Sequence, residues 1–126
     1  MKKEFILCDA MKILIIDDEV DICNFLNYSL KKRNFESSFA HTIADGEQLL
    51  ESYNPSILLL DNHLPDGFGL DYIQKFRQRY PQLKIIMISA YDTPGDRDHA
   101  LRAGADYFIS KPFNIKELNT IIDKVA

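Results

Sequence analysis

The chain has 126 residues, of which 46% are hydrophobic and 27% charged, and its formal net charge is −4. These values are ordinary for one globular domain. Lys and Arg are scattered along the chain, so there is no basic stripe of the kind that binds nucleic acid. No apolar stretch approaches the roughly 18 residues that a membrane span needs. We therefore expect neither nucleic acid nor a membrane as a direct partner.

Residues 1–10 precede the first predicted strand, and we interpret them as a short N-terminal extension of a domain that covers residues 11–126. The segment superficially resembles a signal peptide, but its apolar part is too short and Asp9 interrupts it. Cys8 and Cys23 lack metal-ligand or CxxC spacing. We therefore expect free thiols and a reducing, cytoplasmic location.

Four short apolar runs bounded by polar residues predict strands that are buried on both faces, as in a parallel sheet. Each run leads to a residue with useful chemistry. The runs are 13–16, 57–60, 85–88 and 107–109, and the residues that follow them are Asp17, Asp61, Ser89 and, after Ser110, Lys111. A weaker strand is predicted over residues 35–40.

Apolar residues at helical spacing alternate with these strands. The first predicted helix follows the first strand and is ended by Asn34, and the second covers 43–52. The third covers 70–80 and is ended by Pro81. The fourth covers 93–103, with Thr93 as N-cap, Pro94 at the first position and Gly104 as the stop, and the last covers 115–125. In the first helix, Ile22, Phe25, Leu26 and Leu30 fall on one face. The helix over 93–103 has the thinnest apolar stripe, so we expect it to be the loosest. Five βα units predict a doubly wound α/β sandwich.

Sites in open parallel sheets form at the carboxyl ends of the strands. The pattern therefore gathers Asp17, Asp18, Asp61, Ser89 and Lys111 at one edge. Carboxylates that share a few ångströms repel one another unless a cation neutralises them, and an all-oxygen site suits Mg²⁺. The alternative is that the acidic run after the first strand simply caps the first helix. Capping does not explain why Asp61 and Lys111 end neighbouring strands.

Asp61 is a candidate nucleophile that could form an acyl phosphate. Lys111 would add positive charge and Ser89 a hydroxyl donor to a phosphoryl oxygen. Taken singly, Lys111 reads as a surface lysine and Ser89 as a strand-end cap. A dinucleotide or flavin site is excluded because the turn after the first strand, residues 17–21, is acidic rather than rich in glycine.

Several motifs together resemble the receiver domain of bacterial two-component response regulators, including chemotaxis regulators, over residues 11–126. The motifs are Asp17-Asp18, the run 58–61, Leu-Pro-Asp-Gly-Phe-Gly at 64–69, Ser89-Ala90, Ala-Gly-Ala-Asp-Tyr at 103–107 and Lys-Pro-Phe at 111–113. The resemblance implies a (βα)5 three-layer sandwich with the flavodoxin-like strand order 2-1-3-4-5. It also implies a cis peptide bond between Lys111 and Pro112.

The resemblance further implies roles for single residues. Asp61 would accept a phosphoryl group from a sensor histidine kinase, and Ser89 and Lys111 would contact that group. The ligands of Mg²⁺ would be Asp18 directly, Asp17 through water, Asp61, and the backbone carbonyl of His63.

Phe108 occupies the family's switch-aromatic position, where movement of the Ser89 hydroxyl would make room for the ring. An ordinary core phenylalanine is the alternative. The resemblance also implies that His63 and Tyr91 flank the path of the hydrolysing water, and we expect the bulk of Tyr91 to slow loss of the phosphoryl group. His41 and His99 show no ligand spacing and are interpreted as surface residues.

The leading hypothesis is therefore a phosphoacceptor signalling module that catalyses only its own phosphotransfer and autodephosphorylation. The alternatives are a Mg²⁺-dependent phosphohydrolase with an aspartate nucleophile, or a pseudo-receiver that is never phosphorylated. A hydrolase would usually carry a second Asp where this chain has His63. The output partner or output domain is left open, as is a homodimer through the fourth helix, fifth strand and fifth helix.

Overall fold

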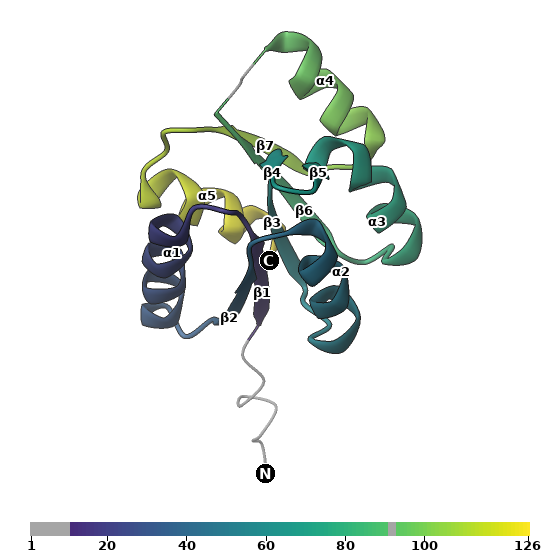
Figure 1. Ribbon diagram of the computed structural model, residues 1–126. Coiled ribbons are helices and arrows are strands. Elements are labelled where there is room, and N and C mark those ends of the chain that lie inside the picture. Colours follow the sequence, from purple (N-terminus) through teal and green to yellow (C-terminus); the bar gives the residue numbers. More distant parts are fainter. Residues whose placement is uncertain (1–10, 91–92) are drawn as a thin grey trace.

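The computed structural model of the protein describes residues 11–90 and 93–126. Its centre is a five-stranded parallel sheet in the order β2-β1-β3-β6-β7 (Figure 1). The strands are β1 (Lys12–Ile16), β2 (Glu36–Ala40), β3 (Ile57–Asp61), β6 (Lys84–Ser89) and β7 (Tyr107–Ser110). Numbered among themselves, these five strands have the order 2-1-3-4-5, which confirms the predicted fold class.

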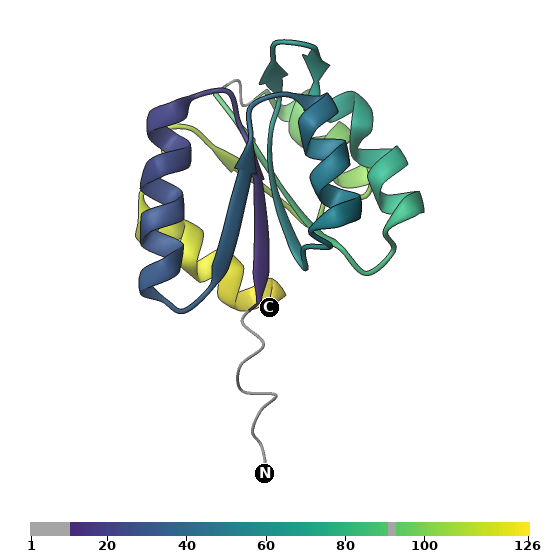
Figure 2. The same cartoon turned by 60° about the horizontal axis from the view of Figure 1, so that its bottom comes forward.

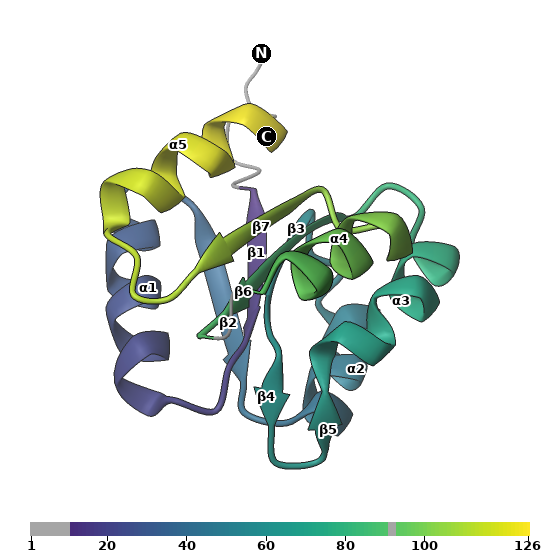
Figure 3. The same ribbon diagram turned by 90° about the horizontal axis from the view of Figure 1, so that it is seen from above.

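Within the described residues, four α-helices connect the strands and a fifth follows the last strand, and together they cover both faces of the sheet. They are α1 (Val20–Lys32), α2 (Ile43–Ser52), α3 (Ile73–Arg79), α4 (Pro94–Ala103) and α5 (Ile115–Val125). Helices α1 and α5 lie on one face, while α2, α3 and α4 lie on the other (Figures 2 and 3). No helix in the described part of the chain has the length and apolar character needed to cross a membrane.

The two faces of the sheet bury two separate apolar clusters, because successive side chains of a strand point in opposite directions. In β1, Leu14 and Ile16 join the cluster under α2, α3 and α4, whereas Ile13 and Ile15 join the cluster under α1 and α5. All five residues of β3 are buried. This two-sided burial explains why the strands appear in the sequence as continuous apolar runs rather than as alternating patterns.

The predicted ends of the helices are confirmed at α1 and α4. The Thr93 hydroxyl accepts a hydrogen bond from the backbone N–H of Asp96 at 3.1 Å, and Pro94 occupies the first turn. Gly104 ends α4 with a φ of 121°, in the region that favours glycine. Asn34, just beyond α1, has a φ of 66°, as a helix stop requires.

Two predictions about the helices need correction. The segment predicted as one helix over 70–80 begins with a 3₁₀ turn, η2 (Gly69–Tyr72), and becomes α-helical only at α3. On α1, Phe25 is 52% exposed, while Cys23 is buried together with Leu26 and Leu30. The buried face of α1 is therefore rotated away from Phe25 toward the smaller Cys23.

A short antiparallel hairpin, β4 (His63–Leu64) with β5 (Gly67–Phe68), follows β3 and was not predicted. Figure 2 shows it beyond the upper end of the sheet. The carboxylate of Asp66 at its turn accepts hydrogen bonds from the backbone N–H groups of Ile43 and Ala44 at 2.9 and 3.0 Å. These bonds attach the hairpin to the first turn of α2, and they lower the pKa of Asp66.

Gly69 closes the hairpin against the end of β3. Its N–H donates to the Asn62 carbonyl at 2.8 Å, and a Cβ at this position would lie 2.3 Å from the backbone oxygen of Asp61. No side chain can occupy that space unless the backbone shifts. Glycine is therefore required where the hairpin approaches the last residue of β3.

We expect Gly69→Ala to lower the free energy of unfolding by roughly 1–3 kcal/mol, because the added methyl group must displace backbone rather than a flexible side chain. Gly95→Ala is a matched control on α4, where the nearest atom to the added Cβ is the Thr93 hydroxyl at 4.0 Å. There we expect a gain of less than about 1 kcal/mol from helix propensity. Urea unfolding measures both, and equal effects of the two substitutions would contradict the close approach at Gly69.

Candidate functional site

Three carboxylates meet at the carboxyl ends of β1 and β3. Asp17 directly follows β1, Asp18 is next in the turn, and Asp61 is the last residue of β3. One carboxylate oxygen from each lies within 4.8 Å of those from the other two. Asp17 is 2% exposed and Asp61 5% exposed, whereas Asp18 is exposed. The structure therefore brings together the acidic residues that the strand-end pattern predicted.

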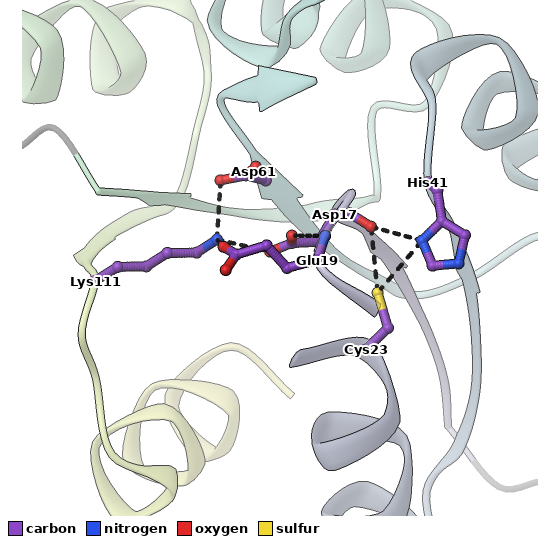
Figure 4. A network of polar contacts seen from close by, with 6 residues as sticks. All are labelled: Asp17, Glu19, Cys23, His41, Asp61 and Lys111. Carbon is purple, nitrogen blue, oxygen red and sulfur yellow. Dashed lines mark hydrogen bonds and ion pairs between the residues drawn. The ribbon is translucent and has the colours of Figure 1, made fainter. Parts of the chain in front are cut away.

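Lys111 contributes its ammonium group to the same site from the segment after β7 (Figure 4). Its Nζ lies 2.9 Å from Asp17 Oδ2, 2.7 Å from Glu19 Oε1 and 3.3 Å from Asp61 Oδ1. Burial alone would lower the pKa of Lys111. Hydrogen bonds to Glu19 and Asp17 and the charge of Asp61 outweigh burial and raise that pKa above its ordinary value. The ammonium group is therefore a fixed positive charge.

The ionised form of Asp61 remains destabilised in spite of the nearby ammonium group of Lys111. Burial and the nearby negative charge of Asp17 raise its pKa from 3.8 to about 6, with Lys111 acting in the opposite direction. A carboxylate with a raised pKa is one whose ionised form is under-stabilised. The site therefore carries more negative charge than its single ammonium group neutralises.

The two acidic residues after β1 are held differently. Asp17 Oδ1 accepts the backbone N–H of Glu19 at 2.9 Å, and its Oδ2 accepts from Lys111. Glu19 is the N-cap residue of α1, but its side chain makes no capping hydrogen bond; it pairs with Lys111 instead. Helix capping by this acidic run therefore does not account for Glu19.

The oxygens of Asp17, Asp18 and Asp61 are an all-carboxylate donor set, which fits a hard divalent cation such as Mg²⁺ better than a thiophilic metal. The raised pKa of Asp61 points the same way, because a bound cation would favour its ionised form. The chemistry of these residues therefore agrees with the predicted metal.

Cys23 and His41 contact this site, although neither was predicted to belong to it. Cys23 Sγ donates to the backbone oxygen of Asp17 at 3.3 Å, and His41 Nδ1 lies 2.9 Å from the same oxygen (Figure 4). His41 is half-buried, so its interpretation as a surface residue is wrong. Its position directly after β2, at the same sheet edge as Asp17, is the signal that could have revealed it. Cys23 is a free cysteine, as predicted.

The other predicted residues lie around the acidic group. Ser89 ends β6 and is 1% exposed, and its backbone oxygen accepts the N–H of Lys111 at 2.8 Å. Phe108 is buried on β7, one of the partners of α4 in the apolar cluster. His63 is exposed on the hairpin, with its ring centroid 5.3 Å from that of Phe68.

The remaining predictions fall at the margins of the site. The peptide bond between Lys111 and Pro112 is cis, as expected. His99 is exposed on α4, which agrees with its interpretation as a surface residue. Tyr91, Cys8 and the segment 1–10 lie outside the described residues.

We expect Asp61→Asn to raise the free energy of unfolding by about 1–3 kcal/mol at pH 8 without metal. The pKa of Asp61 is about 6 in the folded state and 3.8 by ordinary value. Ionisation of Asp61 therefore lowers the free energy of unfolding by its full effect well above pH 6. The effect becomes progressively smaller toward pH 4 and vanishes below it. The gain from Asn should shrink in the same way as the pH falls.

Urea unfolding at pH 8, 6 and 4, in a chelator, measures this pH dependence. Asp71→Asn, an exposed carboxylate on η2, is the control and should change stability by less than about 0.5 kcal/mol. An Asp61→Asn gain that is equal at every pH would contradict the electrostatic account.

Comparison with known proteins adds independent support for this fold and motif set. Residues 13–123 match the family model described as the response regulator receiver domain. The chain is 36% identical to the response regulator protein PilR of Pseudomonas aeruginosa over 111 aligned residues. The aligned segment makes up 88% of this chain and 25% of PilR. It thus spans about a quarter of that relative's length.

Solved structures show the same architecture. A CheY-like response regulator receiver domain from Methanospirillum hungatei JF-1 superposes with a TM-score of 0.87 and 30% identity, covering 93% of this chain and 94% of that one. A Burkholderia pseudomallei response regulator, solved with a phosphorylated aspartic acid and a calcium ion, gives a TM-score of 0.82 at 24% identity, covering 87% and 65%. With 111 of its residues matched by the family model, the chain belongs to the response regulator receiver domain family.

Proposed function

We propose that this domain is a phosphoacceptor whose Asp61 receives a phosphoryl group and whose partner-binding surface changes as a result. The observation that carries the proposal is the position of Asp61. It is 5% exposed at the end of a fully buried strand, close to Asp17 and Asp18 and 3.3 Å from the ammonium group of Lys111. A rigid carboxylate among groups that bind cations and anions suits nucleophilic phosphoryl transfer.

In this step a carboxylate oxygen of Asp61 attacks the phosphorus of a phosphohistidine on a sensor histidine kinase. The P–N bond breaks, the imidazole leaves, and an acyl phosphate forms. Lys111 is close enough to Asp61 to stabilise negative charge on the transferred group, and Ser89 offers a hydroxyl from the next strand end. The other ring nitrogen of the phosphohistidine carries a proton, so the imidazole leaves as a neutral group. Asp61 attacks as a carboxylate and has no proton to lose, so neither Lys111 nor Ser89 needs to transfer a proton.

Mg²⁺ would be held by Asp18, by Asp61, by the backbone carbonyl of His63 and, through water, by Asp17. When bound, it reduces the repulsion between an anionic nucleophile and an anionic phosphodonor. The exposure of Asp18 leaves it accessible to the ion, while Asp17 has both oxygens engaged with Lys111 and the Glu19 N–H. This difference supports a direct role for Asp18 and a water-mediated role for Asp17.

Signalling would then pass from the phosphoryl group through Ser89 to Phe108. The two strands are paired so that Ser89 is opposite Ser110 and Met87 opposite Phe108. A shift of Ser89 at the end of β6 therefore acts on Ser110 of β7, which is two residues after Phe108. We expect the change to be a population shift between two packings of Phe108.

The partners in this proposal are a histidine kinase and an output partner or output domain, in the cytoplasm, with homodimerisation through α4, β7 and α5 as one form of output. Receiver domains are signalling modules rather than classical enzymes, which favours this function over phosphomonoester hydrolysis. A pseudo-receiver is disfavoured because Asp17, Asp18, Asp61, Ser89 and Lys111 are all present.

Incubation with acetyl phosphate and Mg²⁺ should add the mass of one phosphoryl group to the intact protein. No adduct should form when a chelator of Mg²⁺ is present from the start, or in Asp61→Asn, which lacks the nucleophilic oxygen. Asp66→Asn is a matched control, since this carboxylate caps α2 instead of joining the acidic group. An adduct that persists in Asp61→Asn, or turnover of a generic phosphomonoester, would contradict the proposal.

Tyr91 is expected to shield the acyl phosphate from water. We therefore predict that Tyr91→Ala accelerates loss of the phosphoryl group by about tenfold at constant Mg²⁺. The decay of the phosphorylated mass after removal of the donor measures the rate. Unchanged decay in Tyr91→Ala would show that this side chain does not set the lifetime.

A further inference from the structure

Helix α4 lies with α2 and α3 on one face of the sheet, but it buries little apolar side-chain surface there. Ala100 is its one fully buried side chain, and Leu101 is 44% exposed. An alanine methyl group buries little area, so polar contacts must supply much of the attachment. Two arginines provide such contacts, one at each end of the helix.

The C-terminal end of α4 is held by Arg77 of α3. The Arg77 guanidinium donates from Nε and Nη2 to the carbonyl of Gly104 at 3.1 and 2.8 Å. Nη2 also pairs with Asp106 at 2.8 Å, and Asp106 in turn accepts the backbone N–H of Ile85 at 2.8 Å. This end of the helix is therefore bound to α3 and to the start of β6.

The N-terminal half is held by Arg97, which reaches across to β7. Its guanidinium carbon lies 4.8 Å from the centroid of the Phe108 ring, within the range of a cation–π contact. Nη1 donates to the carbonyl oxygen of Phe108 at 3.3 Å, and Nη2 lies 3.5 Å from Ser110 Oγ. Arg97 is exposed, whereas Phe108 is only 7% exposed. The guanidinium group therefore lies between the ring and solvent.

The stretch of β7 that Arg97 touches leads directly into the acidic site. Ser110 pairs with Ser89, and the next residue, Lys111, donates its backbone N–H to the Ser89 carbonyl. The Lys111 ammonium group contacts Asp17 and Asp61. A movement of Lys111 toward an anion on Asp61 therefore pulls on the residue that Arg97 holds.

We propose that Arg97 is a positioning residue that holds Phe108 and the N-terminal half of α4 in the arrangement described above, and that this arrangement has a lower affinity for an anion on Asp61 than the one it competes with. An anion on Asp61 opposes this hold through Ser89, Ser110 and Lys111, and α4 then pivots about its Arg77 anchor. The inference rests on the proposed function, because it assumes that Asp61 receives an anionic group. By linkage, a contact that stabilises the arrangement of lower affinity must weaken binding of that group.

The test uses beryllofluoride with Mg²⁺ as the phosphoryl probe, with bound fluoride followed by ¹⁹F NMR at sub-saturating beryllium. Arg97→Ala should bind about three- to tenfold more tightly than the wild type, since it loses the stacking on Phe108 and the polar contacts to Phe108 and Ser110. Arg97→Lys should fall between the two, because an ammonium group keeps the charge but lacks the planar fork. Arg102→Ala, on the same helix and paired with Asp98, is the matched control and should bind like the wild type.

Hydrogen exchange of the free proteins supplies a second readout. Arg97→Ala should exchange faster over residues 96–100 while the amides near Gly104 keep their protection, because the Arg77 anchor is intact. A merely structural arginine would accelerate exchange along the whole helix and would not tighten beryllofluoride binding.

Unchanged or weaker binding by Arg97→Ala, with the wild type binding normally, would overturn the role of Arg97 and leave the proposed function intact. Absence of bound beryllofluoride in the wild type itself would overturn the proposed function, and the inference with it. The wild-type titration therefore separates the two failures.

Discussion

The ammonium group of Lys111 is the interaction on which the carboxyl edge of the sheet depends. It contacts carboxylates from three places in the chain, Asp17, Glu19 and Asp61, and it comes from the segment that follows the last strand. One positive charge cannot balance these three and Asp18 as well. Burial and the charge of Asp17 together raise the pKa of Asp61. The domain thus keeps buried carboxylates whose ionised forms are under-stabilised, which costs stability and suits a site for a cation.

The strands that form this edge are packed to different extents. Asp61 belongs to β3, the central strand, and every residue of that strand is buried. Ser89 and Lys111 stand at the ends of β6 and β7, toward the side of the sheet where α4 packs with little buried apolar surface. Asp61 therefore stands on a fully buried strand, whereas Ser89 and Lys111 stand beside a helix whose buried side chain is that of Ala100. The proposed function depends on this difference, because a response to charge at Asp61 has to reach a helix while the core stays packed.

Much of the fold could be predicted because it follows from local signals. Continuous apolar runs identified the strands, and Thr93, Pro94 and Gly104 marked the ends of α4 through their backbone preferences. The β4–β5 hairpin escaped prediction because strands of two residues have no periodicity to detect. It is held instead by tertiary contacts, such as those of Asp66 with the N-terminus of α2.

The site was predictable only in part, for a similar reason. Strand ends place Asp17, Asp61, Ser89 and Lys111 at one edge regardless of side-chain detail, so these residues could be assigned from the pattern. The contact of His41 with Asp17 depends on the register between β1 and β2, which pairs Ile16 with Ala40. The exposure of Phe25 depends on how α1 is rotated against the sheet. Neither quantity is encoded in the spacing of apolar residues.

Cys23 shows how strongly the acidic edge constrains its surroundings. A thiolate in this position would add another negative charge beside Asp17. Burial and the charge of Asp17 raise the pKa of Cys23 to about 12, so the thiol stays protonated at neutral pH. It can then donate to the Asp17 backbone oxygen, a role that an ionised sulfur could not fill. A small, neutral, weakly donating side chain is thus compatible with a neighbourhood that already holds more carboxylates than its one ammonium group can neutralise.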